Sequence, residues 1–161
     1  MRAAALLAAA LAAGCAQIEL KPPQGPFEFD LAARIGARYG QESFTGNVAW
    51  RHASGGDEMF ITTPFGQGVA RIVREGEAVQ LPTAEPRTYR SNDAEDLTER
   101  VLGFRVPIVG LAAWVQGKPA PDLERRGWKI EYQEYDESRR PARMRLTYQG
   151  IELRLAVMKW N

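Results

Sequence analysis

The sequence predicts a mainly β protein: a long antiparallel meander that curls into a barrel, with two helices covering one of its mouths. Three observations support this fold class. Apolar and polar residues alternate in many segments after residue 26, which is the period of a β-strand. The period becomes helical only in the middle of the chain. A long open sheet curls, and closure into a barrel removes its exposed edges.

The first half of the chain is expected to form short strands separated by turns. Pro64-Phe65-Gly66 breaks the alternation as a turn, and Glu75-Gly76 and Pro82–Pro86 separate later strands. The strands predicted here are Phe29–Ala37, Phe44–Trp50, Asp57–Thr63, Val69–Val73, Ala78–Leu81 and Thr88–Arg90.

Two helices are predicted in the middle of the chain. Asn92–Leu102 begins with an N-cap asparagine, carries acidic residues in its first turn and ends at Gly103. Ile108–Gln116 is more apolar and ends before a glycine and a proline. We expect Ala120–Arg126 to be a linker. Alternation then returns in three further strands: Trp128–Tyr135, Met144–Tyr148 and Ile151–Val157.

The charge balance argues against a nucleic-acid partner. The 161 residues include 21 basic and 20 acidic side chains, and no basic run exceeds two adjacent arginines. Binding to phosphate backbones requires a basic patch, and binding to anionic membranes requires a polybasic cluster. Any attachment to a membrane must therefore come from another feature of the chain.

That feature is the N-terminal stretch Met1–Cys15. One basic residue, Arg2, precedes an apolar run from Ala3 to Ala13, and small residues follow, as in a secretory signal peptide. The run is too short to span a bilayer, which takes about 20 residues. Leu11–Cys15 resembles a bacterial lipobox, in which the cysteine is lipidated, although the place usually held by leucine is Ala12. An ordinary signal peptide that contains a cysteine remains the alternative.

Three segments follow from this reading. We expect residues 1–14 to be a lipoprotein signal peptide, residues 15–26 a lipidated tether rich in proline, and residues 27–161 the barrel domain. Cys15 is the sole cysteine, so no disulfide can form within the chain. Ala16 stands where an aspartate would retain a lipoprotein at the inner membrane, which indicates the outer membrane.

The residues needed for catalysis are largely missing. His52 is the single histidine, and we expect it at a solvent-facing strand end, so no Ser-His-Asp arrangement or His/Cys metal site is predicted. Gly66-Gln67-Gly68 opens a strand and is a poor phosphate loop. The acids of Glu131–Glu137 alternate with apolar residues, as on a solvated strand face. We predict no catalytic residues, no metal, no cofactor and no enzymatic activity.

The aromatic residues are more informative. Most are expected to be packed in the core. Phe65 differs because it lies between Pro64 and Gly66 in a turn, where burial is difficult. Its side chain is either folded back onto its own hairpin or exposed for contact with an apolar partner. The residues alone leave both possibilities open.

Several segments together match one known family. Phe29–Gly36, Trp50 and Thr62–Gly66 are followed by the most specific block, Tyr89–Pro119, and by a closing strand that ends in Trp160. In this order, behind a lipobox, they resemble the LolB family of outer-membrane lipoprotein receptors. The resemblance covers essentially the whole chain after the leader.

This resemblance implies a half-open antiparallel barrel with a lid of two or three short helices, shared with the periplasmic carrier LolA. Such proteins accept lipoproteins from LolA in a hydrophobic cavity and insert them into the outer membrane, without a catalytic centre. The implied partners are a lipoprotein-loaded LolA-like carrier, the outer-membrane bilayer and the acyl chains of the cargo. We expect a monomer that is anchored through Cys15 in the periplasm-facing leaflet.

The family also carries a protruding loop with an exposed apolar residue, usually leucine, in an Asn/Thr-Pro-Leu-Gly setting. Thr63-Pro64-Phe65-Gly66 occupies that motif, so the resemblance implies a membrane-insertion loop of Pro64, Phe65 and Gly66. Phenylalanine replaces the usual leucine and keeps its apolar character.

Residues facing the cavity can be predicted only by strand parity, and a one-residue shift of register would invert them. The residues expected to contact acyl chains are Trp50, Met59, Ile61, Ile72, Leu111, Val115, Ile130, Tyr132, Leu146 and Leu153.

Three other functions remain open. The chain could be an envelope scaffold with a filled core, or a lipocalin-like carrier of a small hydrophobic ligand, which would not need an exposed Phe65. An envelope enzyme is the weakest alternative because it would depend on His52.

Overall fold

The computed structural model describes residues 20–82 and 88–161. The predicted signal peptide, Cys15 and the first part of the tether lie outside the described residues. In the part described, the strands are β1 (Phe29–Tyr39), β2 (Glu42–Ala53), β3 (Gly56–Thr62), β4 (Gly68–Glu75), β5 (Ala78–Pro82), β6 (Thr88–Ser91), β7 (Lys129–Tyr135), β8 (Pro141–Tyr148) and β9 (Ile151–Trp160). The helices are α1 (Ala94–Leu102), α2 (Ile108–Val115) and α3 (Pro121–Arg125).

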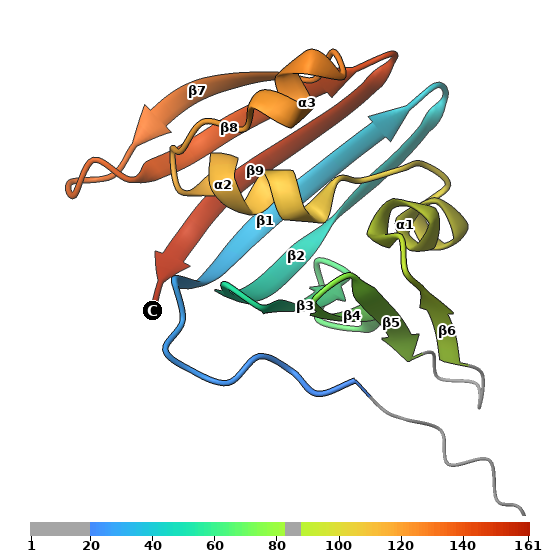
Figure 1. The fold of residues 1–161 in the computed structure, drawn as a ribbon. Coiled ribbons are helices and arrows are strands. Elements are labelled where there is room, and N and C mark those ends of the chain that lie inside the picture. The colour runs from blue at the N-terminus through green and yellow to red at the C-terminus, as the bar shows by residue number, and fades with distance from the viewer. Residues whose placement is uncertain (1–19, 83–87) are drawn as a thin grey trace, which may run out of the picture.

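The strands form one curved antiparallel sheet in the order β6-β5-β4-β3-β2-β1-β9-β8-β7 (Figure 1). The first and last strands of the domain, β1 and β9, pair with each other near the middle of the sheet. Within the described residues β6 and β7 are its two edge strands, and they do not pair with each other. The predicted mainly β, half-open barrel is therefore confirmed, and the edges are not removed by full closure.

Register places the apolar positions of neighbouring strands on the same face. Leu31 of β1 lies opposite Trp50 of β2, which lies opposite Met59 of β3, and Met59 lies opposite Ile72 of β4. All four side chains are buried. Their neighbours in sequence point to the outer face, because successive strand residues point to opposite sides. The inner, concave face is consequently apolar.

The three helices form the lid and lie on the concave side of the sheet (Figure 1). Helix α1 is capped by Asp93, whose carboxylate accepts a hydrogen bond from the backbone N–H of Glu95 at 2.8 Å. The predicted cap, the asparagine at position 92, was one residue too early. Gly103 ends the helix with φ of 80°, a left-handed conformation that glycine adopts without strain.

Helices α2 and α3 pack closely at one point. A Cβ atom at Gly110 of α2 would lie 2.4 Å from Cγ of Leu123 in α3, so a larger residue would require Leu123 to shift. The segment Ala120–Arg126, predicted to be a linker, contains α3. Pro121 occupies its first turn, where its missing N–H is not needed. None of the helices among the described residues is long and apolar enough to cross a bilayer.

Candidate ligand-binding cavity and exposed hairpin tip

A cavity of about 250 Å³ lies between the concave face of the sheet and the lid. Eight of the predicted residues line it: Trp50, Met59, Ile61, Ile72, Leu111, Val115, Leu146 and Leu153. It is also lined by Ile35, Gly36, Ala37, Phe44, Val48, Val69, Thr98, Phe104, Val106, Ile108, Trp114, Met144, Arg154 and Leu155. The structure therefore brings most of the expected side chains to one place, and their contact with acyl chains stays a prediction.

Two predicted residues do not line the cavity. Ile130 and Tyr132 of β7 lie opposite Leu146 and Met144 of β8 in the register. Both are half-buried and packed against the core. The hydroxyl of Tyr132 donates a hydrogen bond of 2.8 Å to the carbonyl of Trp114 in α2, and burial raises the pKa of this tyrosine. Both lie beside cavity-lining residues of β8, as parity predicts, but neither lines the cavity, and Tyr132 is instead bonded to α2.

The lining residues missed by sequence reasoning come from the strands, from helices α1 and α2, and from the connection between these helices. Ile35, Val48 and Leu155 lie on strands in which apolar and polar residues alternate, so their parity could have identified them. Phe104 and Val106 come from the α1–α2 connection, which has no periodicity, and nothing in the sequence placed them under the lid.

The polar side chains in the lining already have hydrogen-bond or ion-pair partners within the protein. The hydroxyl of Thr98 accepts a hydrogen bond from the N–H of Val106 at 2.7 Å and donates one to the carbonyl of Glu95 at 2.9 Å. The guanidinium of Arg154 pairs with Glu152 at 2.7 Å, and its side chain is 64% exposed. The cavity thus offers apolar contact and little that could orient a polar reacting group.

A buried charged cluster fixes one wall of the cavity. Asp57 is fully buried and accepts hydrogen bonds from the indole of Trp50 at 2.7 Å and from Arg74 at 2.5 Å. Nδ1 of His52 lies 2.7 Å from the same carboxylate. The prediction that His52 faces solvent was wrong, because Asp57 lies opposite it in the β2–β3 register and Phe29 stacks on its ring. This cluster holds Trp50 in place.

No group of three His, Cys, Asp or Glu side chains that could hold a metal ion occurs within residues 20–82 and 88–161. The acidic strip Glu131–Glu137 is largely paired with arginines of the β7–β8 hairpin. Glu131 pairs with Arg145 at 2.5 Å and Glu134 with Arg143 at 3.3 Å. The hydrogen bond from Arg145 is the main cause that lowers the pKa of Glu131. The strip therefore has the character of a solvated face.

The β3–β4 hairpin carries the second notable feature. Its turn is closed by a hydrogen bond from the N–H of Thr63 to the carbonyl of Gln67 at 2.8 Å, and Gly66 has φ of 87°. The side chain of Phe65 at its tip is 94% exposed. Of the two possibilities that the residues left open, exposure is the one observed. Val69, on the returning strand, lines the cavity and is also exposed, so it lies between the cavity and the tip.

Fold and cavity together define the class: a half-open antiparallel barrel with a helical lid over an apolar cavity. A solved structure, a LolA superfamily protein from Nitrosomonas europaea, has a similar fold. Its TM-score is 0.53 and its identity 11%, with 83% of this chain and 84% of that chain covered.

Sequence comparison identifies the family. The family model described as "Outer membrane lipoprotein LolB" matches residues 27–160. An outer-membrane lipoprotein LolB from Thiobacillus denitrificans is 34% identical, with 92% of this chain and 90% of that protein covered. The LolB protein of an Azoarcus species is 32% identical, with 83% of this chain and 78% of that protein covered. The chain belongs to the LolB family, which confirms the resemblance found in the sequence.

Proposed function

We propose that this protein is an outer-membrane lipoprotein that receives lipoproteins from a LolA-like periplasmic carrier and passes them into the outer membrane. The observation that carries the proposal is the lidded apolar cavity in a chain of the LolB family. Membership in that family supports the outer-membrane location and the transfer role. The lipid on Cys15 and the tether of residues 15–26 would hold the domain at the periplasm-facing leaflet.

The energetics require direct transfer between cavities. A bacterial lipoprotein carries three acyl chains with on the order of 45 methylenes, and exposing them to water would cost on the order of 35 kcal/mol at about 0.8 kcal/mol each. Free diffusion of the cargo is therefore excluded. The acyl chains must slide from one apolar cavity to the next while the mouths of the two proteins touch, and then into the bilayer.

The observed cavity is too small for this cargo. An apolar cavity of about 150 Å³ binds one benzene, which is about 25 Å³ per carbon atom. The 250 Å³ under the lid then holds about ten carbons, less than one long acyl chain. The cavity must therefore widen when cargo enters.

Phe65 is suited to the last step. Its ring is already exposed to water, so contact with a bilayer would bury it at no cost to the fold. Burial of a phenylalanine side chain contributes about 1.5–3 kcal/mol. Val69 places an apolar side chain between the cavity and this ring. We propose that Pro64, Phe65 and Gly66 form the loop that contacts the membrane while the cargo leaves.

The alternatives account for less of the structure. A scaffold with a filled core would have no cavity, and a lipocalin-like carrier would have no use for the exposed Phe65. We propose that the protein acts as a monomer, without cofactor or catalytic step, and that transfer follows increasing affinity for the acyl chains.

The test is a transfer experiment with purified components. The lipidated protein in vesicles is incubated with a carrier–lipoprotein complex, without nucleotide, and the cargo is followed from carrier to vesicle. We expect the cargo to leave the carrier and to become membrane-bound only when the protein is present. Cargo that stays on the carrier would refute the proposed function.

A further inference from the structure

The half-open barrel has a seam, defined here as the gap between its edge strands β6 and β7. Helix α1 follows β6 directly, and α3 precedes β7 directly. The helices at the two ends of the lid are therefore attached to opposite sides of the seam. Any movement that widens the seam also separates α1 from α3.

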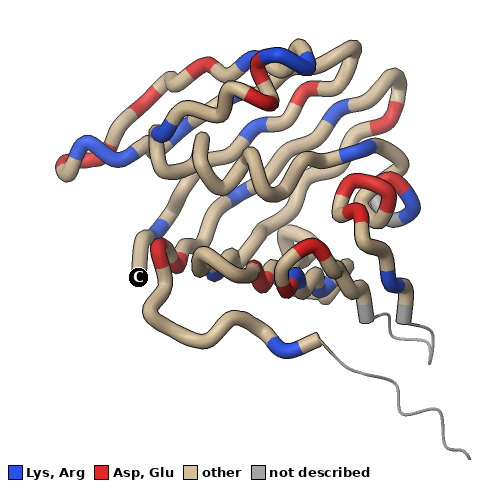
Figure 2. Tube along the Cα trace, viewed as in Figure 1, with Lys and Arg blue, Asp and Glu red and all other residues tan. Residues whose placement is uncertain are grey.

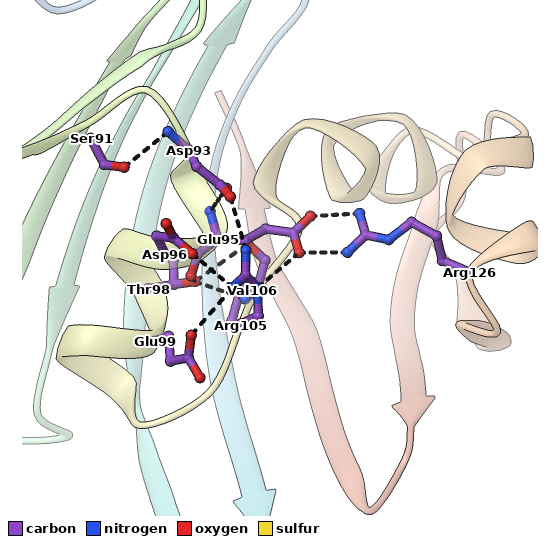
Figure 3. Close-up of polar contacts among 9 residues, drawn as sticks. All are labelled: Ser91, Asp93, Glu95, Asp96, Thr98, Glu99, Arg105, Val106 and Arg126. Atoms are coloured by element: carbon purple, nitrogen blue, oxygen red, sulfur yellow. Dashed lines mark hydrogen bonds and ion pairs between the residues drawn. The ribbon is translucent and has the colours of Figure 1, made fainter.

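One ion pair joins these two sides. The guanidinium of Arg126, at the end of α3, binds both carboxylate oxygens of Glu95 in the first turn of α1, with Nη1 to Oε1 at 2.6 Å (Figure 3). Among the ion pairs of the described residues, this is the one that links α1 to the α3–β7 turn. The Glu95 side chain is 15% exposed and that of Arg126 is 47% exposed. The hydrogen bond with Glu95 is the main cause that raises the pKa of Arg126.

The other acids of α1 are held differently. Arg105, in the α1–α2 connection, lies 2.9 Å from Asp93, 2.7 Å from Asp96 and 3.4 Å from Glu99 (Figure 3). These contacts tie α1 to its own loop. Nε of Arg105 also lies 3.7 Å from Glu95, so this carboxylate is shared, and Arg126 makes the contact across the seam. Figure 2 shows the same contrast, because charged residues crowd α1 whereas α2, over the cavity, has none.

We propose that the Glu95–Arg126 pair is a clasp across the seam, and that it must open before acyl chains can enter the cavity. This inference rests on the proposed function, since it is the cargo that requires a larger cavity. All neighbouring strands are joined by hydrogen-bonded ladders, whereas the seam is not. A partly exposed ion pair costs far less to break than a strand ladder. The barrel therefore widens most easily at the seam.

The first test compares two neighbouring arginines. Arg126→Gln removes the clasp, whereas the control Arg125→Gln removes an exposed pair with Asp122 inside α3. Binding of a fluorescent fatty acid to the full chain is followed by stopped flow. We expect Arg126→Gln to raise the association rate about two- to fivefold, the effect typical of losing an exposed ion pair, and Arg125→Gln to leave it unchanged. Equal rates in the two variants, or a lower melting temperature of Arg126→Gln without a faster rate, would overturn the clasp.

The second test closes the clasp covalently. Glu95→Cys and Arg126→Cys are combined with Cys15→Ser and joined by a bis-maleimide that contains a cleavable disulfide. Fatty-acid uptake should fall at least tenfold after cross-linking and recover after cleavage, with the uncross-linked double variant as control. Unchanged uptake by the cross-linked protein would overturn the clasp alone. Absence of saturable uptake by the unaltered chain would overturn the proposed function and the clasp with it.

Discussion

Replacing Phe65 with glutamate should separate cargo acceptance from membrane insertion. The side chain is 94% exposed and lies at the tip of a tight turn, so the replacement removes no packing from the fold. What it removes is the contribution of the ring to membrane contact, about 1.5–3 kcal/mol. Since 1.4 kcal/mol is a factor of ten, incorporation into the bilayer should slow by about ten- to a hundredfold.

The assay measures the two steps separately. Acceptance is the loss of cargo from the carrier to Phe65→Glu, and incorporation is the appearance of cargo in floated vesicles. Phe65→Leu, which keeps an apolar side chain at the tip, should retain both activities. Tyr135→Glu is the matched control, because Tyr135 is another exposed aromatic residue, 58% exposed, at the far end of β7. It should leave both steps unchanged.

Either of two results would refute the reasoning. Incorporation by Phe65→Glu at the normal rate would show that the ring does not contact the membrane during release. Equal losses in acceptance and incorporation, with an unchanged melting temperature, would place Phe65 at the carrier interface instead.

Three further predictions concern stability. Gly110→Ala places a Cβ against Leu123 and should destabilise the protein by about 1–3 kcal/mol, measured by urea unfolding, and an unchanged midpoint would mean that α2 and α3 do not pack so closely. Asp57→Asn leaves Arg74 buried without its partner charge and should cost about 3–5 kcal/mol in the same assay, whereas a near-neutral result would contradict the buried cluster. The pKa of Glu131 is lowered in the folded protein, so the charged carboxylate stabilises the fold at neutral pH, and this contribution is lost as the pH falls below about 4. Glu131→Gln should therefore reduce the fall of the melting temperature at acidic pH.

The sequence predicted the strands well because each strand separates an apolar face from a polar one. Met59 and Ile61 lie on the concave face and Phe60 on the outer face, as the alternation in β3 requires. Parity also placed Ile130 and Tyr132 on the correct face of β7. It could not show that Tyr132 bonds to α2, because that depends on a contact distant in the sequence.

The other differences have the same origin. The burial of His52 depends on Asp57, which becomes its neighbour only once the register of β2 and β3 is set. Helix α3, with five residues, is too short for its periodicity to be recognised. The exposure of Phe65 could not be derived from the turn alone, since a ring at a hairpin tip can also fold back; the structure shows the ring 94% exposed.

The small volume of the cavity affects the direction of transfer. A receiver whose binding-competent state is only partly populated binds its cargo more weakly by that fraction. The cost of opening the lid is therefore subtracted from the affinity for acyl chains, and it returns when the cargo leaves. A partly exposed clasp such as Glu95–Arg126 keeps this cost small, so that acceptance from the carrier is not prevented. The return of the lid to the narrower cavity then favours release into the bilayer, and the transfer can proceed towards the membrane without a nucleotide.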